Sequence, residues 1–304
     1  MEKFEVNILG CGSALPTTKH FPTSQVINLR DKLYMIDCGE SAQLQLRRAK
    51  INFNRLNHIF LSHIHGDHCF GLPGLISTLS LLGRTADLHI YGPAELDEPL
   101  KMILSTFCYG IEYRVIYHAI DTTQHTLIHE DRSVSVYTLP LKHRIPCCGF
   151  LFKEKGTLPH ILRDMIDFYQ IPTYAINLIK NGADWELADG TIIPNSKLTR
   201  PAAPARSYAY CSDTIYLPEL NKYLSGVDLL FHEATFAEEH RKRAQETYHS
   251  TAKEAATLAR DCKAKKLCIG HFSARYEDEN ILLTEAKEIF PNTILAHEGL
   301  IIQV

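Results

Sequence analysis

Residues 61–68 read Leu61-Ser62-His63-Ile64-His65-Gly66-Asp67-His68, directly after an apolar run typical of a buried strand. His63 and His65 are two apart, so at the end of an extended strand they point the same way. Asp67 and His68 are adjacent and diverge, so one tetrahedral ion cannot easily take all four side chains. The spacing therefore favours two neighbouring metal ions, and a pair of metal ions indicates hydrolysis.

Two plainer interpretations of the cluster have to be weighed. A lone histidine is more often a hydrogen-bonded core residue than a ligand, but three imidazoles and a carboxylate within residues 63–68 exceed what a solvated loop needs. A single structural zinc site is usually rich in cysteine pairs with short spacing. The chain contains no Cys-x-x-Cys, so the cluster does not fit that kind of site.

Composition restricts the class of protein. The chain has 304 residues, 45% of them hydrophobic and 22% charged, which is a globular composition. A net charge of −3 creates no global basic field, so a polyanionic partner would need a local patch or the metals themselves. The nine cysteines form no regular framework, which indicates buried thiols in a reducing compartment. We expect a cytoplasmic protein without signal peptide, membrane span or nucleotide cofactor.

Hydrophobic periodicity predicts strands that alternate with helices in both halves of the chain. The predicted strands cover 4–9, 25–29, 32–37, 57–61, 88–91, 113–116, 133–138, 149–152, 209–211, 229–231, 266–269, 293–296 and 299–304. The predicted helices cover 41–49, 70–82, 96–108, 251–260 and 280–289. This order suggests two sheets packed together with helices outside.

The stretch 153–206 departs from this pattern. It carries five prolines and the turn dipeptides Asn181-Gly182 and Asp189-Gly190, with few apolar residues at core spacing. We predict a single domain over 1–304 from which 153–206 is inserted as a flexible arm.

Three later residues stand where further metal ligands are expected. His143, Asp213 and His271 each follow a predicted strand, at the strand end where a layered α/β scaffold places such ligands. Each alone would be a weak signal, because a histidine or aspartate at a strand end is usually a cap. Together with the first cluster they make seven candidate ligands.

With these residues in view, the chain resembles the metallo-β-lactamase superfamily and, more closely, the ribonuclease Z family of tRNA 3′-processing endonucleases. The first cluster marks only the superfamily. The narrower resemblance is carried by Gly71-Leu72-Pro73-Gly74-Leu75, Tyr91-Gly92-Pro93, Leu141-Lys142-His143-Arg144, Ser212-Asp213-Thr214, Phe231-His232-Glu233-Ala234-Thr235, His249-Ser250-Thr251 and His271-Phe272-Ser273-Ala274-Arg275-Tyr276. The resemblance implies an αββα sandwich with an inserted tRNA-binding arm.

The resemblance also implies a role for each candidate residue. His63, His65 and His143 would hold one Zn²⁺, Asp67, His68 and His271 the other, and Asp213 would bridge both. Asp67 would also orient or deprotonate the attacking water. His249 would protonate the leaving oxygen, with Glu233 hydrogen-bonded to it. A structural role is expected for His232, and Ser250, Thr251 and Glu254 also read as the start of a helix.

As a member of that family the protein would cut the 3′ trailer from precursor tRNA and leave a 3′-hydroxyl on the tRNA. It would act as a homodimer. The sequence departs from the family pattern in two places: Pro16-Thr17-Thr18-Lys19-His20-Phe21-Pro22 lacks the usual Arg-Asn pair, and the arm mixes acidic with basic residues.

Two other functions remain open at this stage. One is a hydrolase of the same fold that acts on small phosphodiesters or thioesters, and the other is a non-catalytic RNA-binding module with structural zinc. The arm and the His271–Tyr276 segment argue against the first, and the complete ligand set with His249 argues against the second.

Overall fold

The computed structural model describes residues 2–108 and 110–304, which divide into two compact units. Glu154–Ala205 form one unit, and Glu2–Lys153 together with Arg206–Val304 form the other. The larger unit, which we call the core unit, contains two seven-stranded sheets.

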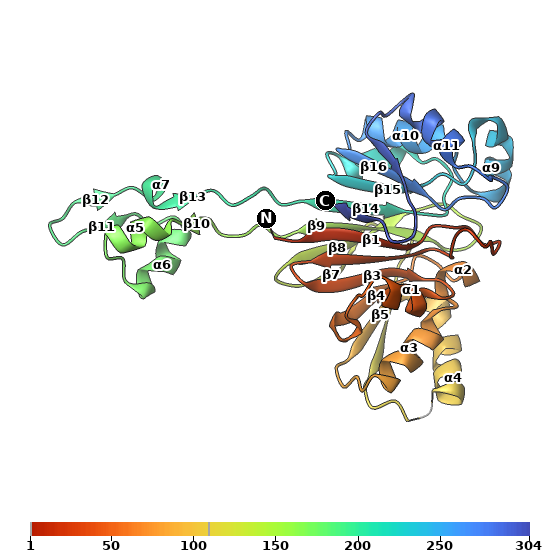
Figure 1. Ribbon diagram of the computed structural model, residues 1–304, viewed down its shortest axis with the longest axis horizontal. Helices are drawn as coiled ribbons and strands as arrows, with labels where there is room; N and C mark the ends of the chain where they lie inside the picture. Colours follow the sequence, from red (N-terminus) through yellow and green to blue (C-terminus); the bar gives the residue numbers. More distant parts are fainter. Residues whose placement is uncertain (1, 109) are drawn as a thin grey trace. The chain divides into compact units, whose positions relative to one another are not determined.

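The two sheets of the core unit are stacked face to face (Figure 1). The first sheet has the order β18 (Ile301–Gln303), β1 (Phe4–Gly10), β2 (Ser24–Leu29), β3 (Lys32–Cys38), β4 (Leu56–Phe60), β5 (Leu88–Pro93) and β6 (Val115–Ile120). The second has the order β17 (Thr293–Leu295), β16 (Lys266–Gly270), β15 (Leu229–Glu233), β14 (Ser207–Cys211), β9 (Cys148–Glu154), β8 (Val134–Pro140) and β7 (Leu127–Glu130).

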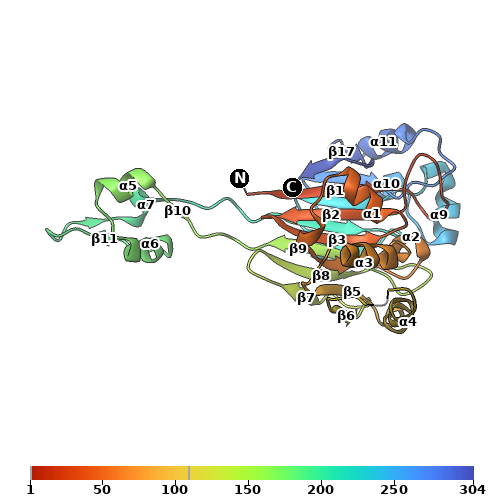
Figure 2. The ribbon, with the colours of Figure 1, turned by 60° about the horizontal axis from the view of Figure 1, so that its bottom comes forward.

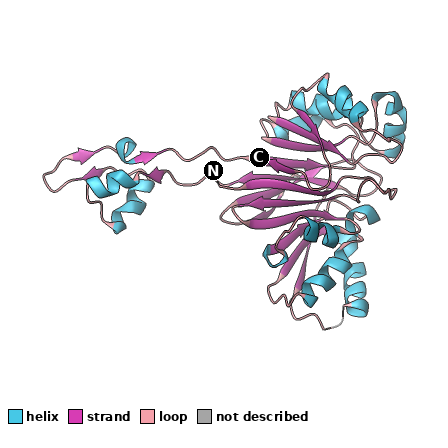
Figure 3. Ribbon diagram, viewed as in Figure 1, coloured by secondary structure: helices cyan, strands magenta, loops and turns pink. Residues whose placement is uncertain are grey.

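Helices lie outside the two sheets and leave the strands between them (Figures 1 and 3). On the side of the first sheet are α1 (Ala42–Arg48), α2 (Gly66–Cys69), α3 (Leu72–Leu81) and α4 (Asp97–Phe107). The second half of the chain supplies α8 (Asn221–Leu224), α9 (Arg241–Thr247), α10 (Ala252–Asp261) and α11 (Asn280–Lys287). The predicted αββα sandwich is therefore confirmed. Among the described helices, none is long and apolar enough to cross a membrane.

Burial on both faces explains why the central strands are almost continuously apolar. Every residue of β15 is buried, and the main core cluster fills the space between the sheets with aromatic rings such as those of Phe60, Phe150 and Phe231. Strands covered by helices on one side and by a second sheet on the other lose the alternation of a half-exposed strand.

The start of α10 shows how local sequence positions the site. Thr251 caps the helix by accepting from the Glu254 N–H, and the Glu254 side chain accepts from the Thr251 N–H, which confirms the predicted capping box. This box fixes the chain directly after His249, a candidate catalytic residue.

Most predicted elements of the core unit are present, with ends displaced by a few residues. The strand predicted over 113–116 is displaced: Tyr113 precedes it, with its hydroxyl donating to the Ile76 carbonyl oxygen, and β6 runs over Val115–Ile120. Strand β7 and helix α9 were not predicted, because their short segments are largely exposed and carry little hydrophobic periodicity.

The unit Glu154–Ala205 consists of short helices and strands (Figures 2 and 3). It has its own small core, although the sequence showed few apolar residues at core spacing. Ile171, Ala175, Ile179, Ile193 and Leu198 are buried together. Its elements are β10 (His160–Ile161), α5 (Arg163–Phe168), α6 (Thr173–Lys180), β11 (Trp185–Glu186), β12 (Ile192–Ile193), α7 (Asn195–Leu198) and β13 (Thr199–Arg200).

Candidate metal centre and active site

The candidate ligands lie just beyond the ends of four strands of the core unit. His63 and His65 follow β4, His143 follows β8, Asp213 follows β14 and His271 follows β16. Asp213 and His271 both have a left-handed backbone, with φ of 57° and 60°. Such conformations are uncommon for residues other than glycine and cluster at functional sites, where the surrounding structure holds them.

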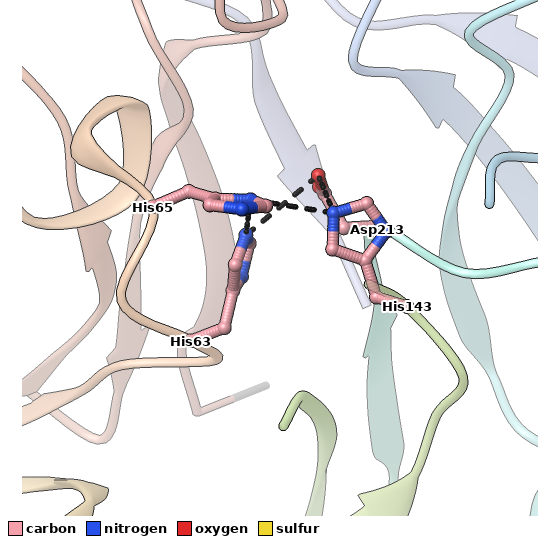
Figure 4. A group of neighbouring side chains, drawn as sticks. All are labelled: His63, His65, His143 and Asp213. Atoms are coloured by element: carbon pink, nitrogen blue, oxygen red, sulfur yellow. Dashed lines mark hydrogen bonds and ion pairs between the residues drawn. The ribbon is translucent and has the colours of Figure 1, made fainter. Parts of the chain in front are cut away.

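The first group of ligand atoms comes from three histidines and one carboxylate oxygen (Figure 4). His65 Nδ1 lies 3.0 Å from His63 Nε2 and 3.3 Å from His143 Nε2. Asp213 Oδ2 lies 3.7 Å from the His63 nitrogen and 3.6 Å from the His143 nitrogen. Nitrogen and oxygen ligand atoms around a tetrahedral zinc ion are separated by roughly 3.3–3.6 Å, given bonds of about 2.0–2.2 Å. The group is therefore close to the geometry that zinc requires.

The second group faces the other oxygen of the same carboxylate. Asp213 Oδ1 lies 3.2 Å from His68 Nε2 and 3.2 Å from His271 Nε2. Asp67 Oδ2 lies 3.4 Å and 3.7 Å from the same two nitrogens. Asp213 thus directs one oxygen to each group, which is the arrangement expected of a bridging ligand.

Unpaired buried atoms indicate that both groups suit a cation. His68 Nε2 and His271 Nε2 are buried and make no well-aligned hydrogen bond among the described residues, although Asp213 Oδ1 lies 3.2 Å from each. Such atoms are costly unless something coordinates them. Burial lowers the pKa of His63, His65 and His143, so these rings are neutral, as metal ligands must be. Imidazole nitrogen and carboxylate oxygen are ligands that zinc accepts.

Asp37 orients His68 through Nδ1, the ring nitrogen that faces away from the candidate metal position. Its Oδ2 atom accepts from His68 Nδ1 at 2.7 Å, from the Tyr210 hydroxyl at 2.6 Å and from the Ser62 hydroxyl at 2.9 Å. A carboxylate on the far nitrogen of a ligating histidine fixes the tautomer and leaves the other nitrogen free to bind metal. Asp37 is fully buried, so its only evident task is this hydrogen-bonding one.

Two further histidines are held in the same way. The Tyr248 carbonyl oxygen accepts from His143 Nδ1 at 3.0 Å, and the Thr235 hydroxyl lies 2.9 Å from His271 Nδ1. Thr235 itself donates to Glu233 at 2.5 Å. In each case the nitrogen that faces the candidate metal position is the one left without a proton.

Glu233 and His249 form a buried pair beside the second group. His249 Nδ1 lies 3.0 Å and 3.2 Å from the two Glu233 carboxylate oxygens. The Thr214 and Ser250 N–H groups also donate to Glu233. Burial would lower the pKa of His249, but the charge and the hydrogen bond of Glu233 outweigh it and raise that pKa to about 9. Glu233 therefore holds a protonated imidazole at the site.

The ligands open onto a pocket of about 500 Å³. His65, Asp67, His143, Asp213, His249 and His271 form one part of its lining. Three exposed arginines, Arg144, Arg243 and Arg275, also line it. Guanidinium groups bind phosphate oxygens in bidentate geometry, so this pocket can receive a phosphodiester.

The structure brings together all seven candidate ligands and both candidate catalytic partners. His232 stays apart: it is buried, and its Nδ1 atom lies 2.7 Å from the Glu233 carbonyl oxygen. Sequence reasoning missed Asp37 and Thr235 as positioning residues. Asp37 at the end of a predicted strand, in Asp37-Cys38-Gly39, and Thr235 in the His232–Thr235 motif were the available signals.

Curated relatives match this chain along its entire length. A protein named ribonuclease Z from Bacteroides fragilis is 64% identical over 304 residues, which is 100% of both chains. Another of that name from Porphyromonas gingivalis is 57% identical and covers 98% of both. The chain belongs to the ribonuclease Z family. The resemblance drawn from the motifs is thereby confirmed.

Family models and solved structures agree with the fold. The family model for the anti-Pycsar protein Apyc1 matches residues 4–158, and that for the β-lactamase superfamily domain matches 199–272. The crystal structure of human tRNase Z, short form, aligns with a TM-score of 0.72 at 25% identity over 98% of each chain. The metallo-β-lactamase fold protein YhfI from Bacillus subtilis aligns with a TM-score of 0.70 at 17% identity, over 99% of this chain and 100% of YhfI.

Proposed function

We propose that this protein is a zinc-dependent endoribonuclease that removes the 3′ trailer of precursor tRNA. Ribonuclease Z enzymes are tRNA 3′-endonucleases, so the enzyme class follows from family membership. The observation that carries the metal dependence is the Asp213 carboxylate, which presents one oxygen to each of two groups of buried ligand atoms. Two Zn²⁺ ions per subunit would occupy these groups.

In this proposal His63, His65 and His143 would hold one ion, Asp67, His68 and His271 would hold the other, and Asp213 would contribute a carboxylate oxygen to each group. A pair of zinc ions would supply an activated water and neutralise the negative charge that develops on the phosphate. Asp67 orients the water, because its carboxylate lies in the pocket lining and contacts the second group.

His249 donates a proton to the leaving 3′ oxygen. It lines the pocket, its Nδ1 atom is fixed by Glu233, and its other ring nitrogen is thereby available for the substrate. Water attack on phosphorus with departure of the upstream oxygen leaves a 3′-hydroxyl on the tRNA. Arg144, Arg243 and Arg275 bind the phosphates on either side of the cut.

The unit Glu154–Ala205 serves as the tRNA-binding arm, and the enzyme acts as a cytoplasmic homodimer. Exposed apolar side chains on the first-sheet side support a subunit contact there: Phe70 is 74% exposed, Leu81 85%, Met102 64% and Phe107 77%. Large apolar side chains left exposed in this way are typical of association sites.

The direct test uses precursor tRNAs with and without an encoded CCA end. Purified enzyme should cut at the trailer boundary and leave a 3′-hydroxyl, and dialysis against a chelator should abolish cutting until Zn²⁺ is restored. Asp67→Ala should lose cleavage, whereas Asp121→Ala, the same change in an exposed loop, should not. An Asp67→Ala enzyme that cuts at the wild-type rate would overturn the mechanism.

Hydrolysis of small phosphodiesters is the second candidate, because the two ligand groups and their pocket belong to the core unit and could also receive a small phosphodiester. Removal of the arm separates the two functions. Lys153 and Ser207 are paired across antiparallel strands, so Asn-Gly in place of Glu154–Ala205 would close a short hairpin. A tRNA enzyme should then lose precursor cleavage and keep activity on a small phosphodiester. Unchanged cleavage of precursor tRNA would exclude the arm from substrate binding.

A further inference from the structure

A second set of metal-ligating side chains lies outside the catalytic pocket. Cys11 follows β1, His20 lies in the loop that leads to β2, and Glu298 lies in the turn between β17 and β18. None of the three lines the pocket that contains the seven ligands. The Cys11 side chain is fully buried, and the His20 and Glu298 side chains are 11% and 20% exposed.

The donor atoms of these three residues converge on one point. His20 Nδ1 lies 3.3 Å from Cys11 Sγ and 3.0 Å from Glu298 Oε2, and Cys11 Sγ lies 3.8 Å from Glu298 Oε1. A tetrahedral zinc ion separates such donors by roughly 3.3–3.6 Å. Shifts of a few tenths of an ångström would therefore place all three in coordinating positions.

Outer contacts orient these ligands as they do in metal sites. Glu279 Oε1 lies 3.1 Å from His20 Nε2, so this carboxylate accepts the proton of the far ring nitrogen and turns Nδ1 toward the cysteine. The Phe21 N–H donates to Glu298 Oε1 at 2.9 Å, and Lys19 pairs with Glu279. A thiolate, an imidazole and a carboxylate together form a set that favours zinc over magnesium or calcium.

We propose that Cys11, His20 and Glu298 form a third, structural binding site for a thiophilic divalent ion such as Zn²⁺. The site joins the loop 11–22 to the C-terminal turn. The loop that carries Cys11 is also hydrogen-bonded to the segment after His271. The Phe272 N–H donates to the Cys11 carbonyl oxygen at 3.0 Å, and the Ser13 N–H donates to the Phe272 carbonyl oxygen at 3.2 Å. Ser13, Ala14 and Leu15 line the pocket, and Phe272 follows the ligand His271.

Cobalt substitution tests this site separately from the catalytic centre. The seven catalytic candidates include no cysteine, so a near-ultraviolet thiolate-to-cobalt charge-transfer band reports a metal ion bound outside that set. We expect apoprotein titrated with Co²⁺ to show this band, and Cys11→Ser to lose it with unchanged far-ultraviolet circular dichroism. Glu279→Gln should weaken Co²⁺ binding in this band by about 10–100-fold.

Two cysteines near the catalytic ligands supply matched controls. Cys69 Sγ lies 3.3 Å from the His65 carbonyl oxygen, and Cys147 Sγ lies 3.7 Å from that of Asp213. Cys69→Ser and Cys147→Ser should keep the band. Should Cys11→Ser fail to fold, His20→Gln retains the thiol and must still weaken the band. A wild-type protein without the band, or a folded Cys11→Ser or His20→Gln protein with undiminished binding, would overturn the proposal.

Discussion

Replacement of Asp37 by asparagine should weaken metal binding at the group that contains His68. Asp37 has a left-handed backbone with φ of 54°, a conformation that asparagine tolerates, so the fold should accept the change. The asparagine oxygen can keep the hydrogen bond from the Ser62 N–H, made at 2.8 Å. Its amide NH₂ would then stand where Oδ2 now accepts from His68, Tyr210 and Ser62.

The size of the effect follows from this reversal of donor and acceptor. An NH₂ group facing His68 Nδ1 favours the tautomer with its proton on Nε2, the atom that should bind metal. Loss of such an outer carboxylate typically costs 10–100-fold in metal affinity, or about 1.4–2.7 kcal/mol. Buried hydrogen bonds to a charged group are worth about 1.5–3 kcal/mol each, so unfolding of the metal-free protein should also become easier by about 3 kcal/mol.

Competition with a chromophoric chelator, carried out in Cys11→Ser protein so that the third proposed site is absent, measures the two catalytic-site affinities separately. Asp37→Asn should bind one ion 10–100-fold more weakly than wild type and the other with a smaller change. Tyr210→Phe is the matched control: it removes one hydrogen bond to Asp37 and keeps the His68 contact, so metal affinity should hold while stability falls by about 1.5–3 kcal/mol. Wild-type affinity for both ions in Asp37→Asn would refute the assigned role of Asp37.

Three further outcomes are expected. Saturation with Zn²⁺ at a hundred times its Kd should raise the free energy of unfolding by about 2.7 kcal/mol per site over the chelated protein, and calorimetry that finds no difference would exclude a preformed site. His249→Gln should lower kcat by about 10²–10⁴-fold with little change in KM, and a loss confined to KM in single-turnover and steady-state assays would contradict its role as proton donor. Burial lowers the pKa of His58 to about 3. Below about pH 6.5 this histidine is therefore protonated in the unfolded chain and stays neutral in the folded chain. The free energy of unfolding should therefore keep its full His58 contribution above pH 6.5 and be about 2 kcal/mol lower at pH 5 from His58 alone. In urea unfolding, His58→Phe should remove that loss, whereas the same change at exposed His160 should not. Equal pH slopes for His58→Phe and wild type would refute the assignment.

The sequence was informative about the fold and the metal ligands for a physical reason. Ligands at strand ends follow short apolar runs, and the order of such runs along the chain reveals both the strands and the positions beyond them. His143, Asp213 and His271 could be found in this way, and the structure brings them together with the first cluster. Their role as ligands stays a prediction that the metal titrations above address.

The supporting residues could not be found in the same way, because their roles depend on contacts between distant segments. Asp37 holds His68 from 31 residues away and accepts from Tyr210, 173 residues away, across the space between the two sheets. The Cys11, His20 and Glu298 group spans nearly the entire chain, and its members look unrelated in the sequence. An aspartate or a cysteine at a strand end has the same local pattern whether it orients a ligand or merely caps a strand. Only the partner across the fold distinguishes these roles, and so substitutions such as Asp37→Asn and Cys11→Ser test what the sequence pattern could not predict.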